Sequence, residues 1–258
     1  MPALIFDCDG VLADTERDGH LPAFNAAFAE AGLPVVWSES DYAEKLKIGG
    51  GKERIASVFT PELDATIGVS TEVERADWIK QLHLRKTALF TERVAEGLLP
   101  GRPGIRRIIA DALVAGWTVA VASTSAEPSV RAVLRHVAGD ASYDQVHVFA
   151  GDIVRAKKPA PDIYLKVLED LRLDPDECAV VEDSGIGVAA ATAAGLTTVV
   201  TVSSFTAEDD FTGAALILSD LGDPDAPPTV IASPAGITPA GHLTLADLTA
   251  LIAKEHNL

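Results

Sequence analysis

Short apolar runs alternate with stretches of helical periodicity between residues 98 and 218. These runs, together with one near the N-terminus, predict strands at residues 4–6, 118–122, 146–149, 179–181 and 197–202. The stretches between them predict helices at residues 103–115, 127–138, 161–171 and 186–194. The strand runs are continuously apolar, which is typical of parallel strands that are covered on both faces. Because strands alternate with helices, we predict a doubly wound, Rossmann-like α/β fold with a parallel sheet.

Residues 15–95 interrupt this alternation. The region contains no clear strand and predicts helices at residues 19–31, 38–47, 52–59 and 71–94. Gly32 follows the first of these helices, at a position where a glycine commonly ends a helix. We therefore predict an α/β core made of residues 1–14 and 96–258. The inserted helical domain of residues 15–95 is called the cap below.

The sequence after Asp220 is rich in proline, glycine and aspartate. It predicts one short strand at residues 229–232 and one amphipathic helix at residues 245–255. Thr244 and Asp247 have the spacing of a capping box at the start of this helix. Its apolar face predicts packing against the core, without a chemical role.

The composition narrows the range of partners. The formal net charge of the 258 residues is −17, so the chain lacks the basic surface that nucleic acid or an anionic membrane requires. We find neither a signal-peptide pattern nor an apolar run of membrane-spanning length. Cys8 and Cys178 form no disulfide framework, and their predicted positions along two strands are too far apart for a bond. We therefore expect a cytoplasmic monomer with free thiols that acts on a small molecule.

An apolar strand that ends in carboxylates is the first chemical signal. The sequence Leu-Ile-Phe-Asp-Cys-Asp-Gly-Val places Asp7 and Asp9 at the carboxyl end of the first strand. Ligands bind at this end of open α/β sheets, and alternate positions direct both carboxylates to one site while Cys8 points elsewhere. One carboxylate can attack as a nucleophile and the other can transfer protons. A turn with solvated aspartates is the alternative interpretation.

A second acidic strand end lies at Glu182 and Asp183, directly before a predicted helix. A simple helix cap also explains these residues. However, two acidic strand ends in one sheet bring together the oxygen ligands that Mg²⁺ prefers. Because like charges repel, such a cluster requires a cation or a raised pKa. The sequence therefore indicates either a site for a cation such as Mg²⁺ or a carboxyl group with a raised pKa.

Two further strand–helix junctions carry groups that suit phosphate. Ser123, Thr124 and Ser125 follow a predicted strand, and hydroxyl groups beside a helix N-terminus bind phosphate well, although capping alone also explains them. Lys158 precedes a proline, which biases its backbone toward an extended form. Its ammonium group can offset the charge of a phosphate, whereas Lys157 is better explained as a surface lysine.

The four junctions together resemble the motifs of the haloacid dehalogenase superfamily of phosphohydrolases. Asp7 and Asp9 match the first motif, Ser123 the second, Lys158 the third, and Glu182 with Asp183 the fourth. The insert between the first and second motifs is similar to the helical cap of that superfamily. The resemblance covers almost the whole of the predicted core.

This resemblance implies a role for each matching residue. Asp7 would form an aspartyl-phosphate, and Asp9 would protonate the leaving alcohol and then activate water. Asp7, the carbonyl of Asp9 and Asp183 would hold Mg²⁺, with Glu182 nearby or bridged to it. The groups that would hold the transferring phosphoryl oxygens are Ser123, Thr124, Ser125 and Lys158.

The cap carries candidate residues for the rest of the substrate. Residues 15–90 contain 9 basic and 12 acidic side chains, so this region is much less acidic than the remainder of the chain. The candidates are Glu16, Gly50, Gly51, Lys52, Arg54, His83 and Lys86. The glycines could open a helix N-terminus to an anion, and the three basic side chains could bind a second phosphate. A solvated helix face is the alternative interpretation.

The cap motifs narrow the resemblance further. Asp14-Thr15-Glu16, Gly-Gly-Lys-Glu-Arg and His83-x-x-Lys-Thr are similar to the CbbY-type subgroup, the xylulose-1,5-bisphosphate phosphatases of carbon-fixing organisms. That subgroup removes the 1-phosphate from a misfire product of Rubisco and releases xylulose 5-phosphate. The resemblance implies that a bisphosphate lies between core and cap and that Glu16 binds sugar hydroxyls.

Three alternatives remain at this stage. A β-phosphoglucomutase-like phosphomutase shares the same core and cap class. A broad sugar-phosphate or phosphoglycolate phosphatase would not need three basic groups in the cap. A non-catalytic binding protein on the same fold is disfavoured, because Asp7, Asp9, Lys158 and Asp183 are all present.

Overall fold

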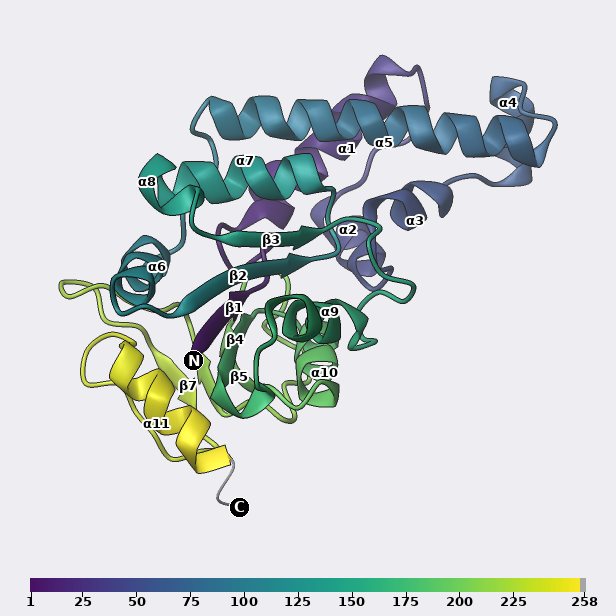
Figure 1. Ribbon diagram of the computed structural model, residues 1–258. Coiled ribbons are helices and arrows are strands. Elements are labelled where there is room, and N and C mark those ends of the chain that lie inside the picture. Colours follow the sequence, from purple (N-terminus) through teal and green to yellow (C-terminus); the bar gives the residue numbers. More distant parts are fainter. Residues whose placement is uncertain (256–258) are drawn as a thin grey trace.

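Seven strands form one sheet, as the computed structural model of residues 1–255 shows (Figure 1). In spatial order these are β3 (His147–Ala150), β2 (Thr118–Ser123), β1 (Ala3–Phe6), β4 (Cys178–Glu182), β5 (Thr197–Thr201), β6 (Leu216–Leu218) and β7 (Val230–Ala232). All neighbours are parallel except β7, which pairs antiparallel to β6. The chain starts in the centre and builds outward in both directions, so the predicted doubly wound α/β fold is confirmed.

Register brings the ends of the central strands level. Phe6 of β1 lies opposite Val121 of β2 and Val181 of β4. The backbone N–H of Asp7 donates to the carbonyl of Val181 at 2.9 Å, so the ladder continues one residue beyond the strand. The residues that follow these strands therefore emerge at one edge of the sheet, on either side of the point where the strand order reverses.

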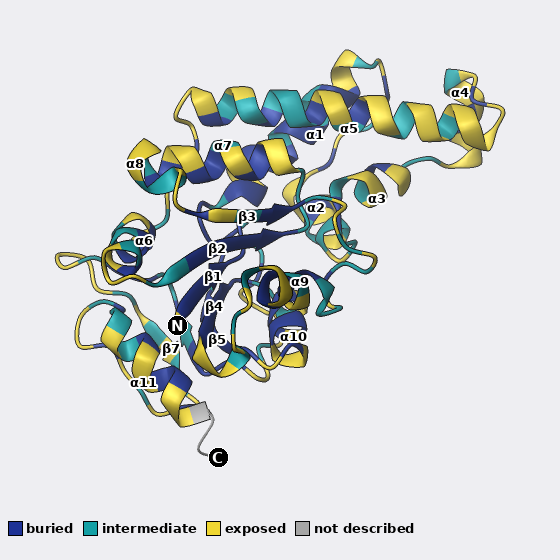
Figure 2. Cartoon of the chain, viewed as in Figure 1, coloured by how far each residue is buried: buried dark blue, intermediate teal, exposed yellow. Residues whose placement is uncertain are grey.

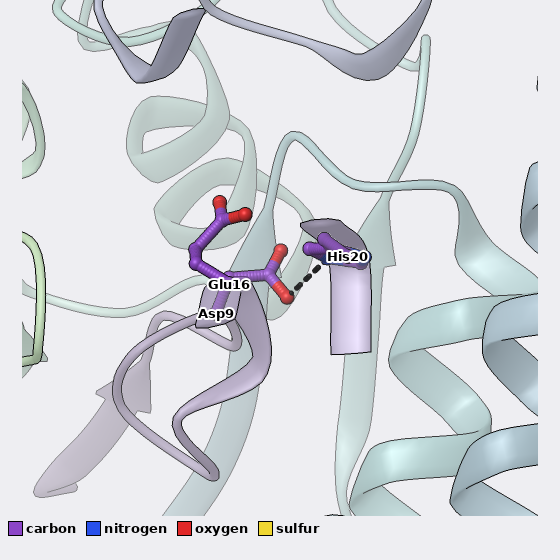
Figure 3. Close-up of side chains that lie close together, drawn as sticks. All are labelled: Asp9, Glu16 and His20. Atoms are coloured by element: carbon purple, nitrogen blue, oxygen red, sulfur yellow. Dashed lines mark hydrogen bonds and ion pairs between the residues drawn. The ribbon is translucent and has the colours of Figure 1, made fainter. Parts of the chain in front are cut away.

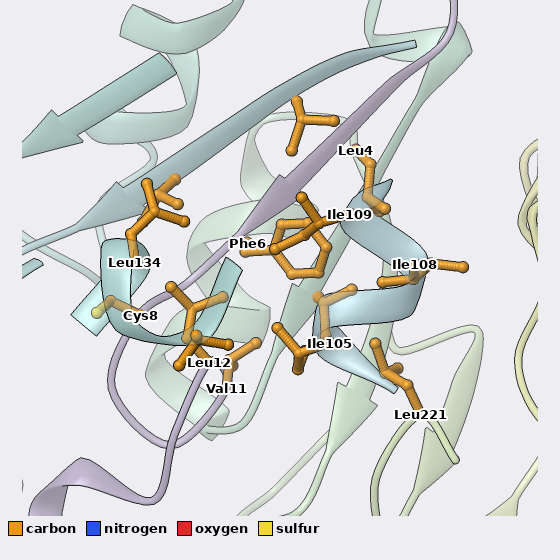
Figure 4. Packing of buried hydrophobic residues seen from close by; sticks show 14 of the residues in the cluster. Leu4, Phe6, Cys8, Val11, Leu12, Ile105, Ile108, Ile109, Leu134 and Leu221 are labelled. Carbon is orange, nitrogen blue, oxygen red and sulfur yellow. The ribbon is translucent and has the colours of Figure 1, made fainter. Parts of the chain in front are cut away.

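Helices cover both faces of the sheet. These are α6 (Ile105–Val114), α7 (Glu127–Ala138), α8 (Asp140–Tyr143), α9 (Asp162–Leu171), α10 (Gly185–Ala193) and α11 (Leu245–Glu255), with a 3₁₀ turn at Pro175–Glu177. Leu4 and Phe6 pack against residues of α6 and α7 (Figure 4), in a hydrophobic cluster that also includes residues of α11. Ala3 and Ile5 face the opposite cluster, beneath α9 and α10. Burial on both faces explains the continuously apolar runs of β1 and β4, which Figure 2 shows in dark blue.

The segment between β1 and α6 is helical and has its own hydrophobic cluster. It contains a π-helical turn (Glu16–His20), α1 (Leu21–Glu30), α2 (Glu39–Leu46), α3 (Gly51–Ala56), α4 (Pro61–Ile67) and α5 (Glu72–Ala95). The cluster is formed by aromatic and aliphatic side chains, among them Phe24, Phe28, Trp37, Tyr42, Ile55 and Leu82. The long helix α5 packs against both α1 and α7, which anchors the cap beside the core (Figure 1).

Several boundaries differ from the sequence-based prediction. The helix predicted at residues 19–31 begins as the π-helical turn at Glu16 and ends at Glu30, and Gly32 has the expected positive φ of 70°. α4, α8 and β6 were not predicted. The sequence does contain signals for the start of α4, a threonine at the capping position and a proline as the first helical residue. In the structure Thr60 accepts the capping hydrogen bond, and Pro61 is the first residue of the helix. α8 and β6 are too short to produce a period.

The tail follows the prediction. β7 completes the edge of the sheet, and Thr244 and Asp247 exchange the hydrogen bonds of a capping box before α11. Residues 256–258 of the predicted core lie outside the described residues. Cys8 and Cys178 are buried free thiols, as expected. Among the residues described, no helix combines the length and the apolar character that crossing a bilayer requires.

Candidate active site

One cavity of about 480 Å³ lies between the carboxyl ends of the strands and the cap. Most of the candidate residues from both regions line it, namely Asp7, Asp9, Glu16, Gly50, Gly51, Arg54, His83, Lys86, Ser123, Thr124, Ser125, Lys158 and Asp183. Glu182 is fully buried beneath the cavity. Lys52 does not line this cavity, so the structure separates it from the other basic candidates.

Three carboxylates from two strand ends meet at the floor of the cavity. Oxygen atoms of Asp7, Glu182 and Asp183 all lie within 4.8 Å of one another. The Nζ atom of Lys158 donates to Asp7 Oδ1 and to Glu182 Oε1, each at 2.6 Å, and to the carbonyl of Ala122 at 3.0 Å. All three ammonium hydrogens of Lys158 are therefore used within the core.

The floor carries more acid than Lys158 balances. Burial raises the pKa of Asp7 to about 8, with Lys158 opposing the shift and Glu182 adding to it. Burial and the charges of Asp7 and Glu182 also raise the pKa of Asp183 well above its ordinary value. Buried carboxylate oxygens in excess of basic groups are a donor set that fits a divalent cation with a preference for oxygen ligands.

Asp9 lies beside this cluster in a different environment. Its Oδ1 accepts a hydrogen bond from His20 Nε2 at 2.7 Å (Figure 3) and another from Thr15 Oγ1 at 2.5 Å, and its Oδ2 accepts from Ser125 Oγ. Burial alone would raise the pKa of Asp9, but the adjacent His20 and these hydrogen bonds lower it well below its ordinary value. Asp9 is therefore an ionised carboxylate, whereas the raised pKa of Asp7, close by, reflects burial and the neighbouring acids, which a bound cation would offset.

Lys86 fixes the tautomer of His20. The Lys86 Nζ atom lies 2.8 Å from His20 Nδ1 in a buried contact. Because an ammonium group can only donate, Nδ1 accepts, and the ring proton resides on Nε2, from which it is donated to Asp9. The ring of His20 also stacks on Phe90, with the ring centroids 4.1 Å apart. The chain Lys86–His20–Asp9 thus connects cap and core.

Asp9, Glu16 and His20 also lie close enough together to suggest a second cation site (Figure 3). Their hydrogen bonds do not favour one. The Nε2 proton of His20 occupies the space toward Asp9, and the Glu16 carboxylate is paired with Arg54. We therefore interpret these three residues as part of a hydrogen-bond network.

Glu16 and Arg54 form the wall of the cavity on the cap side. Arg54 Nη1 lies 3.2 Å from Glu16 Oε1 and 3.0 Å from the hydroxyl of Tyr42, which itself donates to Glu16 Oε2. Arg54 Nε donates to the carbonyl of Ile48 at 3.0 Å. These bonds orient one carboxylate and one guanidinium group toward the cavity.

Lys52 takes part in a contact between cap and core. Its ammonium group pairs with Asp152, next to a smaller hollow of about 380 Å³. The Nζ atom of Lys157 lies 2.7 Å from Glu53 Oε1 and 3.2 Å from Asp152 Oδ1. Two neighbouring residues of α3 therefore pair with two core residues of opposite charge, and Lys157 is part of this bridge rather than an isolated surface lysine.

Sequence reasoning assigned no individual role to several residues of the site, although Thr15 lies in one of the cap motifs. These are Thr15, His20, Tyr42, Tyr164, whose hydroxyl donates to Glu182, and Ser203, whose hydroxyl donates to Asp183 at 2.6 Å. His20 could have been found, because it lies four residues after Glu16 and shares its face of a helical turn. The two tyrosines lie in apolar helix faces and give no separate signal in the sequence.

With this site in view, the comparison with known proteins defines the class. Residues 1–195 match the haloacid dehalogenase-like hydrolases, and the chain belongs to this family. The chain is 47% identical over 222 residues to a CBBY-like protein of Arabidopsis thaliana, which covers 86% of this chain and 70% of the relative. It is 44% identical over 261 residues to the plasmid-encoded protein CbbY of Cupriavidus necator, covering 99% of this chain and 97% of the relative.

A solved structure extends the comparison to the fold. A mutant of CbbY from Rhodobacter sphaeroides, crystallised in complex with xylulose 1,5-bisphosphate, superposes with a TM-score of 0.75 at 36% identity. The match covers 85% of this chain and 95% of that chain. The predicted resemblance to the CbbY-type subgroup and the prediction of an enzyme of the hydrolase class are thereby confirmed.

Proposed function

We propose that this protein is a Mg²⁺-dependent phosphatase that removes the 1-phosphate of xylulose 1,5-bisphosphate and releases xylulose 5-phosphate. The observation that carries the proposal is one cavity with basic groups at two ends, Lys158 in the core and Arg54 with Lys86 in the cap. The bisphosphate bound by a structural relative has the two charged ends that such a cavity suits. The division into a core and a cap domain of residues 15–95 belongs to this proposal.

The core residues would carry the chemistry. An oxygen of Asp7 attacks phosphorus, the bond from phosphorus to the ester oxygen breaks, and Asp9 gives its proton to that oxygen. In the second half, Asp9 takes a proton from water, the water oxygen attacks phosphorus, and the bond to Asp7 breaks. Asp7, Asp183 and the carbonyl of Asp9 would hold Mg²⁺, which would neutralise charge on the phosphoryl oxygens.

The hydrogen bonds of Asp9 suit the second half of this reaction. Three donors keep the carboxylate ionised and oriented, which is the state of a general base. The first half needs the protonated acid. A dianionic phosphate beside Asp9 raises its pKa, so the substrate itself favours the protonated form.

Lys158 and Ser123 would hold the phosphoryl group. Since the ammonium hydrogens of Lys158 already bond to Asp7, Glu182 and Ala122, one of these bonds has to be exchanged for a phosphate oxygen. The Asp7 bond is the natural one to exchange, because its oxygen becomes the attacking atom. The Ser123 hydroxyl accepts from the N–H of Ser125 at 3.1 Å and keeps its own hydrogen for the phosphate.

The experiment that tests the function is a panel of substrates. Phosphate release with Mg²⁺ is compared for xylulose 1,5-bisphosphate, ribulose 1,5-bisphosphate, fructose 1,6-bisphosphate, β-glucose 1-phosphate and phosphoglycolate. A strong preference for the xylulose bisphosphate supports the proposal. A flat profile contradicts the substrate assignment, and conversion of β-glucose 1-phosphate to the 6-phosphate with little release identifies a mutase instead.

Lys86 gives a prediction about pH. Burial lowers the pKa of Lys86 from 10.5 to about 8, although Glu16 and Asp9 oppose the shift. Above that pH the cavity loses a positive charge, so we expect kcat/KM of the wild type to fall as pH rises from 7 to 9. In Lys86→Met this alkaline limb disappears, and kcat/KM at pH 7 is at least about tenfold lower, the cost of one hydrogen bond to a charged group.

Steady-state kinetics over this pH range check the Lys86 prediction. Lys80→Met is the matched control, because Lys80 lies on the same helix α5 but does not line the main cavity. The Lys80→Met variant should keep the fall of kcat/KM between pH 7 and 9. An unchanged limb in Lys86→Met would assign the titration to another group.

Substituting Lys52 and Arg54 one at a time distinguishes the roles of these two basic residues of α3. We expect Lys52→Met to change KM for the bisphosphate by less than about threefold, because an exposed ion pair contributes about 0–1 kcal/mol. Arg54→Met should raise KM by more than about tenfold, because it removes a buried charge that faces the cavity. Comparable losses in both variants would show that Lys52 reaches the substrate.

A further inference from the structure

Arg102 connects three separate segments of the core through backbone carbonyls. It lies in the stretch that returns the chain from the cap to α6. Its Nη1 donates to the carbonyls of Gly10 and Thr201, the latter at 3.0 Å. Its Nη2 donates to the carbonyls of Val202, at 2.7 Å, and Ser219. The five donors of a planar guanidinium group make one side chain sufficient for all four carbonyls.

Two of the three segments that Arg102 holds enclose Asp183. Gly10 packs so closely on this carboxylate that a Cβ at Gly10 would lie 2.0 Å from Asp183 Oδ2. On the other side, Ser203 follows the bonded Val202 and donates from its hydroxyl to the same Oδ2 at 2.6 Å. Asp183 Oδ2 is therefore confined between two residues, and Arg102 bonds to one of them and to the neighbour of the other.

The backbone of Arg102 strengthens this connection. Its N–H donates to the carbonyl of Leu12 at 2.9 Å, so the loop after Asp9 is held by both the main chain and the side chain of one residue. Among the described residues, the ion pairs include no carboxylate partner for Arg102, whereas Arg107 on α6 pairs with Asp111 and Asp223. The side chain of Arg102 thus bonds to backbone next to the site rather than to a surface acid.

We propose that Arg102 is a positioning residue that holds Asp183 ready to bind a cation. By fixing Gly10 and the segment before Ser203, it keeps the carboxylate in one orientation, so that the cation binds without reordering two loops. This inference rests on the proposed function only in that Asp183 is taken as a Mg²⁺ ligand. It goes beyond it by assigning a role to a residue outside the cavity lining.

The role of Arg102 is tested by direct binding of Mg²⁺ to the enzyme without substrate, measured by calorimetry. Arg102→Met removes all the side-chain donors and leaves a shorter, unbranched apolar side chain in their place. Arg102→Lys keeps the positive charge but loses the planar guanidinium group, whose two terminal nitrogens donate to separate carbonyls. Arg107→Met is the matched control, because Arg107 also donates to carbonyls, but to those of Leu221 and Gly222 rather than to the segments of Gly10 and Ser203.

We expect the Kd for Mg²⁺ to rise at least tenfold in Arg102→Met and less in Arg102→Lys. The Kd should stay within about twofold of the wild type in Arg107→Met. At saturating Mg²⁺ the KM for substrate should stay within about threefold of the wild type, while the Mg²⁺ concentration needed for half-maximal kcat rises with the Kd. A purely structural loss would lower the active fraction without moving that concentration.

The opposite result is equally specific. Removing a positive charge close to the carboxylates would by itself tighten Mg²⁺ binding, so an unchanged or lower Kd in folded Arg102→Met overturns the positioning role. If Arg102→Met does not fold, Arg102→Lys decides, because a wild-type Kd in a variant without the guanidinium group also overturns it. A wild-type protein that binds no Mg²⁺ would instead contradict the proposed function itself.

Discussion

Asp7→Asn will release phosphate from its substrate at least about 10⁴ times more slowly than the wild type, because an amide cannot form the acyl-phosphate bond. Asparagine keeps the shape of the side chain and an oxygen that accepts from Lys158, which bonds to Asp7 Oδ1 at 2.6 Å. We therefore expect substrate and Mg²⁺ still to bind, as measured by calorimetry. In EDTA the variant should have a higher Tm, since it removes one of three crowded carboxylates.

The control for Asp7→Asn is Asp144→Asn, which makes the same change at an exposed position. It should leave both turnover and Tm unchanged. Turnover of Asp7→Asn above about one-hundredth of the wild-type rate would show that another group is the nucleophile. Mass spectrometry of the quenched wild-type reaction provides a separate check, because it should detect a phosphoryl group on the peptide that contains Asp7.

Asp9→Asn will lower kcat for a sugar phosphate by about 10²–10⁴-fold, the usual contribution of general acid–base catalysis. With p-nitrophenyl phosphate the result should differ, because this leaving group needs no proton. We expect a burst of one equivalent of nitrophenol and then slow turnover, since the phosphorylated Asp7 forms but no base activates water. Stopped-flow absorbance measures both phases.

Ser125→Ala serves as the comparison for Asp9→Asn. It removes one hydrogen bond from Asp9 Oδ2 but leaves the carboxylate in place. The expected loss is less than about tenfold, without a burst. If Asp9→Asn turns over p-nitrophenyl phosphate at the wild-type rate, the base is another residue, and the arrangement of Thr15 and His20 around Asp9 serves a different purpose.

The core of the site could be predicted from the sequence because strand ends are fixed by register. Once β1 lies between β2 and β4, Phe6 is level with Val121 and Val181, and the polar residues that follow have to meet. Apolar runs reveal the strands, so the residues after them are located without knowledge of helix packing. This is why Asp7, Ser123 and Asp183 come together in the cavity as the sequence indicated.

The cap side was harder because its geometry depends on how helices pack. Lys52 and Arg54 are two positions apart on α3, and positions two apart on a helix do not share a face. Arg54 therefore faces the cavity while Lys52 reaches Asp152 on the core. The sequence alone could have shown that only one of these two residues faces the cavity, but not which one. The π-helical turn that carries Glu16 and His20 is only five residues long, so the spacing of these two residues is the one signal that it offers in the sequence.

The central position of β1 has a consequence for how the chain folds. Ala3 pairs with Thr118 on one side and with Cys178 on the other, so both partners of the first strand are distant in sequence. Closing such long loops is slow compared with forming local helix contacts. The cap helices can therefore fold while the centre of the sheet is still open. Asp7 and Asp183 meet only when β1 pairs with β2 and β4. An incompletely folded chain therefore cannot hydrolyse phosphate esters at this site.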